Sequence, residues 1–421
     1  MLRTLGSVFS LLLGVAVMLL GIGLLGTLLG VRAGVELFPQ TTVGLIMSCY
    51  FAGYVVGTFL CPAIIRRVGH IRAFAAMAAL ASITAIAHAL VVNPWAWGVL
   101  RIMTGMCVVG LYMVIESWLN VLTTSALRGR VFSAYIAVSL LAMAGGQYLL
   151  LVGGVRTFVP FAVASMLLSL ALVPIALTRV LQPTPVEAPE VSLGHLYRIS
   201  PLGSAGALVA GLTSGAFWGM GAVFAQRVGL TGVGIAAFMS VTILGGALLQ
   251  WPVGHYSDNH DRRTVLMVVC FLAAGAALVG FALTRLSPWG LVADGFFYGG
   301  LSFPVYGLAV AHVNDHTEAT QVLEVTRGLL LLYGLGAAAG PASAGVLMQH
   351  LGPGSLMVFF ALAFMLLGGF AVVRMRTSAP PVPPEEQAEF VPMLRTSPVA
   401  LEMDPRADME PELDPTGSGP A

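Results

Sequence analysis

The sequence contains no lysine, and only 9% of its 421 residues are charged, whereas 57% are hydrophobic. In a soluble globular domain about 25% of the residues are charged, so this composition excludes an ordinary water-soluble protein. The formal net charge of +1 points to no particular partner, and we do not expect the chain to bind nucleic acid.

Cysteine is also scarce, which limits the chemistry that the chain can carry. The four cysteines lie in apolar runs without ligand spacing: Cys49, Cys61, Cys107 and Cys270. We therefore expect packing residues, with no disulfide, metal site or cofactor. The sequence has neither an ATP phosphate-binding loop nor a filter-like repeat, which argues against an ATP-driven pump and a channel. It shows no paired nucleophile and base within the apolar runs, so we do not expect an enzyme.

Long apolar runs dominate what is present. A helix that crosses a bilayer needs about 20 mostly apolar residues, and none of the runs alternates in polarity as barrel strands do. Twelve runs are long enough: residues 7–30, 42–65, 73–92, 95–119, 131–153 and 158–178, then 203–226, 232–253, 264–284, 288–312, 328–349 and 355–373. The sequence therefore predicts an all-α membrane protein with 12 transmembrane helices.

The arginines predict how these helices are oriented. With the N-terminus inside the cell, 15 of the 20 arginines fall on the cytoplasmic side and four outside, and Arg101 lies within a run. Because basic residues concentrate in cytoplasmic loops, both termini are predicted in the cytoplasm. We expect a multi-pass protein of a bacterial inner membrane, in contact with the lipid bilayer and monomeric.

Composition divides the chain into four parts. Residues 1–178 and 203–376 are predicted to form six-helix bundles, joined by a cytoplasmic linker at 179–202 that contains QPTPVEAPE. Matches at an offset of 192 residues, such as Gly53 with Gly245 and Trp97 with Trp289, indicate two pseudo-symmetric halves. Residues 377–421, rich in proline and acids, are predicted to be a disordered cytoplasmic tail, and a partner-binding role for it stays open.

A dense polar patch, QWPVGHYSDNHDRR, separates the eighth and ninth runs at residues 250–263. An acid is followed there, one helical turn later, by two cations. The corresponding first-half segment is GTFLCPAIIRRVGHIR, which has Arg66 at the position that matches Asp258. Both stretches are predicted to be short loops at the membrane surface.

These loops and the twelve runs resemble the Major Facilitator Superfamily, whose signature G-x-x-x-D-R-x-G-R-R has a relic in the second half. The matching residues are Gly254, Asp258, Arg262 and Arg263 in the relic, and Gly69, Arg67 and Arg72 in the first-half copy. Asp261 replaces the second glycine of the relic, while Pro62 and Arg66 replace the first glycine and the aspartate of the first-half signature. The segments CYFAGYVVGT, RIMTGMCVVGLYMVIESWLN and QWPVGHYSD are similar to the YcaD-like branch of the family.

The resemblance implies a secondary active transporter that moves a small solute by rocker-switch alternating access, with protons as the coupling ion. Efflux of amphipathic compounds and uptake of an organic anion both stay open, as does a transport-inactive sensor or scaffold. It also implies that Asp258 caps a helix of the other half and latches the cytoplasmic gate. Since Arg66 has replaced the first-half aspartate, only Asp258 supplies a carboxylate for this latch.

Three charged residues lie within the predicted helices, where each costs at least about 2.5 kcal/mol to bury. Arg101, in RIMTG, resembles the R-x-x-q-G motif of the family, which implies proton coupling or substrate contact. Glu116 lies 15 residues later, about 22 Å along the helix, and is either a coupling carboxylate or a gate ion-pair partner of Arg67 or Arg72. Asp294 shares the depth of Arg101, which leaves open a cross-cavity pair or a place at the outer interface.

In this family the first, fourth, seventh and tenth helices line a central cavity. From the resemblance and from their places on the runs we expect four further side chains at this cavity: Tyr112, Gln147, Trp218 and Tyr298.

Overall fold

The structure is a computed structural model that describes residues 2–123, 125–177, 183, 193–317, 321–377, 382–383, 385, 387, 390–391 and 396–403. The first half contains α1 (Leu2–Val35), α2 (Gln40–Val68), α3 (His70–Leu90), α4 (Pro94–Leu122), α5 (Ser125–Tyr148), the 3₁₀ helix η1 (Leu149–Leu151), α6 (Val159–Leu170) and α7 (Leu172–Ala176). The second half contains α9 (Pro201–Arg227), α10 (Gly232–Asp258), α11 (Arg262–Leu286), α12 (Pro288–Ser302), α13 (Pro304–Asn314), α14 (Val322–Leu351) and α15 (Ser355–Thr377). Two short elements are α8 (Leu193–Ile199), before α9, and η4 (Pro398–Met403) in the tail.

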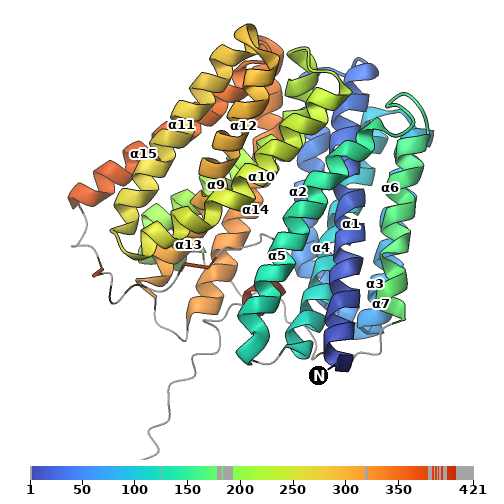
Figure 1. Cartoon of the computed structure of the whole chain (residues 1–421), viewed down its shortest axis with the longest axis horizontal. Helices are drawn as coiled ribbons and strands as arrows, with labels where there is room; N and C mark the ends of the chain where they lie inside the picture. The colour runs from blue at the N-terminus through green and yellow to red at the C-terminus, as the bar shows by residue number, and fades with distance from the viewer. Residues whose placement is uncertain are drawn as a thin grey trace, which may run out of the picture.

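The two halves lie side by side, with α1–α7 to the right in Figure 1 and α9–α15 to the left. Eleven described helices are long and apolar enough to cross a membrane, and Val159–Ile175 is a shorter apolar helix. The predicted all-α membrane fold is confirmed, and the count of twelve agrees with it. The tenth predicted run is divided between α12 and α13 because Pro304 has no N–H to continue the hydrogen bonding of the helix.

Two predicted segments are only partly covered by the structure. Of the linker at 179–202, residue 183 and residues 193–202 are described, and they include α8 and the start of α9. Most of the tail at 377–421 lies outside the described residues. Where the tail is described, Pro398–Met403 form η4, which differs from the expected disorder because these residues pack inside the bundle.

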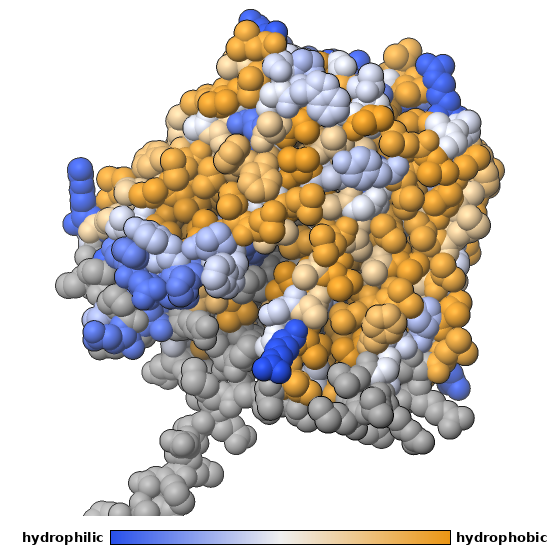
Figure 2. Space-filling model, viewed as in Figure 1, coloured by the Kyte–Doolittle hydropathy of each residue, from blue (hydrophilic) through white to orange (hydrophobic). Residues whose placement is uncertain are grey.

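The outer surface is covered by large apolar side chains, and Figure 2 shows polar residues gathered toward the ends of the molecule. Those exposed on the helices include Phe9, Ile83, Leu141, Leu248, Leu272 and Leu366. A soluble monomer rarely exposes so large an apolar area, whereas lipid tails match it. The protein is therefore a multi-pass integral membrane protein.

Two helices at equivalent places begin in the same way. Asn93 Oδ1 accepts a hydrogen bond from the Trp95 N–H at 2.9 Å, and Ser287 Oγ accepts one from the Gly290 N–H at 3.0 Å. Each cap is followed by a proline, which has no N–H to satisfy and suits the first helical position. The caps, at positions 93 and 287, place the starts of α4 and α12 194 residues apart.

The crossings of α2 with α4 and of α10 with α12 also place equivalent residues of α4 and α12 194 positions apart. A Cβ at Gly53 would collide with the Ile102 carbonyl of α4, and a Cβ at Gly245 would collide with the Phe296 carbonyl of α12. Glycine allows the two backbones to touch at both crossings. The glycines are 192 residues apart, as predicted, but their partners at positions 102 and 296 are 194 apart. Position 295, a glycine, therefore corresponds to Arg101.

The halves meet near one end of the bundle. We call the end with the α2–α3 and α10–α11 turns the arginine-rich end, because it carries Arg66, Arg67, Arg262 and Arg263. Near the opposite end four hydrogen bonds join the halves: Gln40 N–H to Gln349, Ala342 N–H to Ser48, Gln226 to the Val31 carbonyl, and Ser240 to the Ala144 carbonyl. The halves are thus closed together on that side.

Candidate functional site

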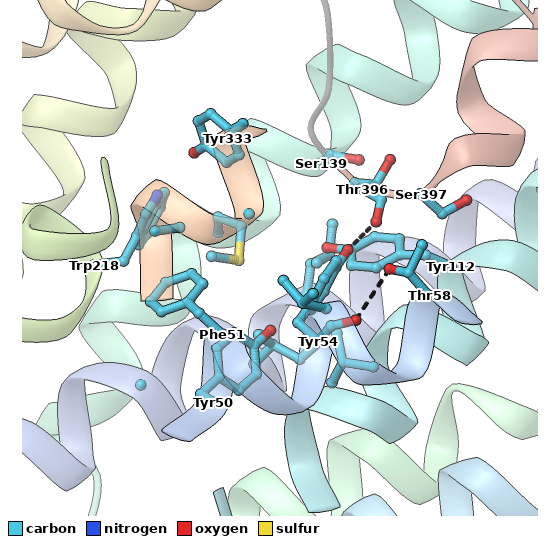
Figure 3. A pocket seen from close by; sticks show the side chains of 18 of the residues that line it. Tyr50, Phe51, Tyr54, Thr58, Tyr112, Ser139, Trp218, Tyr333, Thr396 and Ser397 are labelled. Carbon is cyan, nitrogen blue, oxygen red and sulfur yellow. Dashed lines mark hydrogen bonds between the residues drawn. The ribbon is translucent and has the colours of Figure 1, made fainter. Parts of the chain in front are cut away.

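A cavity of about 220 Å³ lies between the halves. Its walls come mainly from α1, α2, α4 and α5 on one side and from α9 and α14 on the other, with tail residues 396–398. In Figure 3, Trp218 and Tyr333 lie on one side, and Tyr54 and Tyr112 lie on the other with the tail. The aromatic lining residues are Tyr50, Phe51, Tyr54, Phe59, Tyr112, Trp218, Phe303 and Tyr333. The cavity therefore suits an apolar or aromatic body.

Arg101 places a buried cation at this cavity. Its guanidinium carbon lies 4.3 Å from the centroid of the Tyr50 ring, and the residue is only 6% exposed. A cation over an aromatic face is attracted by the ring quadrupole. Among the residues that the structure describes, no carboxylate pairs with Arg101, and its Nε has no hydrogen-bond partner. The tyrosine ring compensates for only part of the lost hydration.

A second arginine, Arg327 at the start of α14, also lines the cavity. The described lining contains these two arginines and neither aspartate nor glutamate. Charges attract more strongly in an interior of low dielectric than in water, so this lining favours an anionic group over a cationic one.

Glu116, one helical turn beyond Tyr112 on α4, is fully buried. Its Oε1 accepts a hydrogen bond from the Tyr135 hydroxyl at 2.6 Å, and its Oε2 accepts one from the Ser397 hydroxyl. Within the described part of the chain no cation pairs with it, and both predicted partners, Arg67 and Arg72, are exposed. The predicted gate ion pair is therefore not formed in this structure.

Asp294 is not at the cavity. It is buried on the face of α12 that packs against α11, where a Cβ at Gly280 would lie 2.6 Å from its Oδ2. The cross-cavity pair with Arg101 is not formed, because Gly295 occupies the equivalent position in α12 and one residue turns a side chain by about 100°. Asp294 instead lies between helices of the second half.

The four predicted lining residues divide into two pairs. Tyr112 and Trp218 line the cavity. Gln147 is buried between α5 and α1, where it accepts a hydrogen bond from the Thr27 hydroxyl and donates to the Met143 carbonyl at 2.9 Å. Tyr298 stacks on Phe360 of α15, with ring centroids 4.8 Å apart. These two side chains bind helices together instead of facing the cavity.

The predicted loop at residues 250–263 is wrong for most of its length, because α10 continues to Asp258 and α11 begins at Arg262. The residues around this short turn form a local ion-pair network. Asp258 Oδ1 accepts from Arg262 Nη2 at 2.8 Å, and Arg262 Nη1 donates to Asp315 Oδ1 at 3.0 Å. Arg263 Nε donates to Asp261 Oδ1 at 3.1 Å. As far as the chain is described, Asp258 is held by its own half and by the tail. It does not cap a helix of the first half, as the resemblance implies, since the halves are joined at the opposite end.

The glycines of the two signature segments have different structural roles, because Gly69 lies in the α2–α3 turn and Gly254 lies within α10. Gly69 adopts a φ of +83° between α2 and α3, a conformation that favours glycine. Gly254 faces the ring of Phe390, and a Cβ there would collide with that ring. Arg67 and Arg72 lie exposed beside the first turn.

Several residues of the site were not predicted: Tyr50, Tyr54, Arg327, Tyr333, Thr396 and Ser397. Tyr50 and Tyr54 are four residues apart, a spacing that places both on one helix face and was available in the sequence. Arg327 lies just before the run at 328–349 and is one of the 15 arginines predicted on the cytoplasmic side. The tail sequence has an apolar stretch at residues 390–403, but this stretch does not indicate where it packs.

Two helical halves around a shared cavity of aromatic and cationic residues define a membrane protein with the architecture of an alternating-access transporter. The chain belongs to the Major Facilitator Superfamily, whose family profile matches residues 7–326 and 203–403. The family prediction is thereby confirmed. Similar relatives include the uncharacterized MFS-type transporter YcaD of Escherichia fergusonii, 28% identical over 84% of this chain and 92% of the relative. YcaD of Salmonella arizonae is 27% identical over 83% and 91%.

Solved structures that share this fold include named transporters. The nucleoside transporter NupG has a TM-score of 0.71 at 13% identity, covering 88% of this chain and 99% of that one. A bacterial homolog of the human lysosomal transporter Spinster, inward-facing and occupied, has a TM-score of 0.73 at 13% identity over 90% and 97%. The human organic anion transporter MFSD10 has a TM-score of 0.60 at 17% identity over 87% and 99%. At these identities the likeness shows the fold alone.

Proposed function

We propose that the protein is a proton-coupled secondary transporter for a small organic anion with an apolar or aromatic body, moved by rocker-switch alternating access. The observation that supports this most is Arg101, buried against Tyr50 at a cavity whose described lining has no carboxylate. The related folds serve chemically different solutes and are distant in sequence, so the proposal depends on the cavity itself.

Recognition would combine charge and stacking. A carboxylate or sulfonate would accept hydrogen bonds from Arg101, since a guanidinium presents donors in a fork that matches these groups. Arg327 would add a second positive charge. The body of the solute would lie among the aromatic rings, with Trp218 and Tyr333 across from Tyr54. A neutral analogue would keep the stacking and lose the charge attraction.

Glu116 is the proposed coupling group. It is buried without a cation beside it among the described residues, and it accepts hydrogen bonds from the hydroxyls of Tyr135 and Ser397. A charged carboxylate is costly at bilayer depth, so Glu116 would take up a proton when shielded and release it when water reaches it. By the positive-inside rule the arginine-rich end faces the cytoplasm of a bacterial inner membrane, and the cavity of this structure would open to that side.

The test is transport by the full chain in proteoliposomes over a panel of aromatic carboxylates and sulfonates, each with its neutral amide, with and without a proton gradient. We expect saturable, gradient-dependent transport of at least one anion and none of its amide. Arg101→Ala should reduce the rate at least about tenfold, and Arg101→Lys, which retains the charge without the fork, should reduce it less.

The outcome that overturns the proposal is equally concrete. Transport of neutral or cationic solutes, undiminished by Arg101→Ala, would show that the buried cation does not select the solute. Absence of transport for the whole panel, by protein that is folded and correctly inserted, would also overturn it and would favour the sensor reading.

A further inference from the structure

The C-terminal tail has an apolar segment within an acidic, proline-rich sequence. Residues 390–403 read FVPMLRTSPVALEM and contain one arginine and one glutamate. The flanking stretches, PPVPPEEQAE before it and DPRADMEPELD after it, are acidic. A tail that stays in solvent is ordinarily polar throughout, whereas an apolar segment is typical of a tail that binds an apolar surface.

One described part of this segment is anchored on the second half. Phe390 is only 7% exposed, and its ring fills the space beside Gly254 of α10 and Gly307 of α13. A Cβ at Gly307 would lie 2.8 Å from that ring. The Phe390 N–H donates to Asp258 Oδ1 at 2.8 Å, so the signature-loop aspartate holds the tail. Gln387 Nε2 also donates to the His260 carbonyl at 3.3 Å.

The other described part is anchored on the first half. The Tyr54 hydroxyl donates to the Thr396 carbonyl, a bond drawn in Figure 3, and the Ser397 hydroxyl donates to Glu116. Val399 and Ala400 are each 1% exposed. The helix η4 packs against α4, α5 and α14, and Figure 1 shows it as a dark red turn between α14 and α5. This part is therefore buried between the two halves.

The first anchor lies on the second half, the hydrogen bonds of the second anchor go to the first half, and residues 396–398 form part of the cavity wall. The halves are joined directly at the opposite end, so at the arginine-rich end the tail occupies the space between them. Attachment to the same chain gives the segment a high effective concentration, so even a modest affinity would keep it bound.

We propose that residues 396–400 are a reversible plug, which the chain inserts into its own cavity and which must leave before a solute can enter. The plug occupies the hydrogen-bonding groups of Tyr54 and Glu116, and Phe390 fastens it beside Asp258. Its removal exposes the cavity to the arginine-rich end. The proposal concerns access to the cavity and does not depend on which solute is carried.

The test measures access directly in the purified protein. Ser139 is a buried lining residue, and its change to Cys in a background with the four native cysteines changed to Ala gives one reporter thiol. The rate of labelling by a bulky maleimide is compared between the full chain and a chain ending at residue 377. We expect labelling about tenfold faster without the tail. A thiol at the exposed Arg72 position should be labelled at the same rate in both.

Point changes give the same test without deletion. Phe390→Ala should accelerate labelling at Ser139→Cys by about threefold or more, whereas Glu385→Ala, an exposed tail residue, should leave the rate unchanged. Equal labelling in the full and shortened chains and in Phe390→Ala would overturn the plug. Tail-dependent labelling without anion transport would overturn the proposed function alone, and anion transport with tail-independent labelling would overturn the plug alone.

Discussion

Arg101 and Tyr50 form a cation–π pair inside the bundle, with the guanidinium carbon 4.3 Å from the ring centroid. The pair takes the place of the carboxylate that a buried arginine ordinarily has. A carboxylate would neutralise Arg101 and remove its attraction for an anion, whereas the ring stabilises the cation and leaves its charge available. The pair therefore supports the proposed role of Arg101 in binding an anion.

Changing Tyr50 should weaken anion binding without removing the cation. Such pairs are worth about 0.5–2 kcal/mol, so Tyr50→Leu should reduce affinity for a transported anion by roughly 2- to 30-fold. Tyr50→Phe retains the ring face and should change affinity little. Competition binding in detergent measures both, and equal losses for the two variants would show that the hydroxyl matters and the ring face does not.

Glu116 and Asp294 should behave differently although both are buried carboxylates. Glu116→Gln should abolish the stimulation of transport by a proton gradient while exchange of anion across the membrane continues. Asp294→Asn, away from the cavity between α11 and α12, should retain the stimulation. Gradient-driven uptake and anion exchange are measured in the same proteoliposomes. If a proton gradient still stimulates transport by Glu116→Gln, Glu116 is not the coupling group.

The helix crossing at Gly105 should tolerate no side chain. A Cβ there would collide with the Tyr50 carbonyl of α2, so Gly105→Ala should destabilise the protein by about 1–3 kcal/mol. Gly275→Ala is the control, because nothing lies within 4 Å of a Cβ at that position. Thermal unfolding in detergent should show a lower midpoint for the first variant only, and a similar midpoint for both would contradict the packing.

The α10–α11 turn should depend on the Asp258–Arg262 pair. Arg262 is 1% exposed, so the loss of one of its two carboxylate partners is costly, but its pair with Asp315 remains when Asp258 is changed. Asp258→Asn should therefore lower the free energy of unfolding by about 1–3 kcal/mol. Asp261→Asn retains the oxygen that caps α11 at the Arg263 N–H and should have a smaller effect. The thermal unfolding midpoints of the two variants test this prediction. Equal shifts for both would contradict the dependence of the turn on the Asp258–Arg262 pair.

The fold followed from the sequence because apolar length and arginine distribution are properties of single helices and loops. The site was harder to predict because it depends on how helices rotate against each other. Asp294 illustrates this, since it lies one residue away from the position equivalent to Arg101 whether the repeat offset is 192, as between Gly53 and Gly245, or 194, as between Ile102 and Phe296. One residue turns a side chain by about 100°, and no composition pattern records such a difference.

Tail residues illustrate a second limit. Ser397 meets Glu116 across 281 positions of the chain, a contact made by tertiary packing alone. A proline- and acid-rich sequence predicts disorder correctly only where no complementary surface is present. Phe390 packs on such a surface at Gly254 and Gly307, and the apolar stretch of the tail does not indicate which surface it contacts.

The most direct measurement is the affinity of the purified protein for one aromatic carboxylate and for its neutral amide, before and after Arg101→Ala. The wild-type chain should bind the carboxylate at least about tenfold more tightly than the amide, because a charge-assisted hydrogen bond contributes about 1.5–3 kcal/mol. In Arg101→Ala the two affinities should become nearly equal. A preference for the carboxylate that survives this change would contradict the assignment of Arg101 as the anion-binding group.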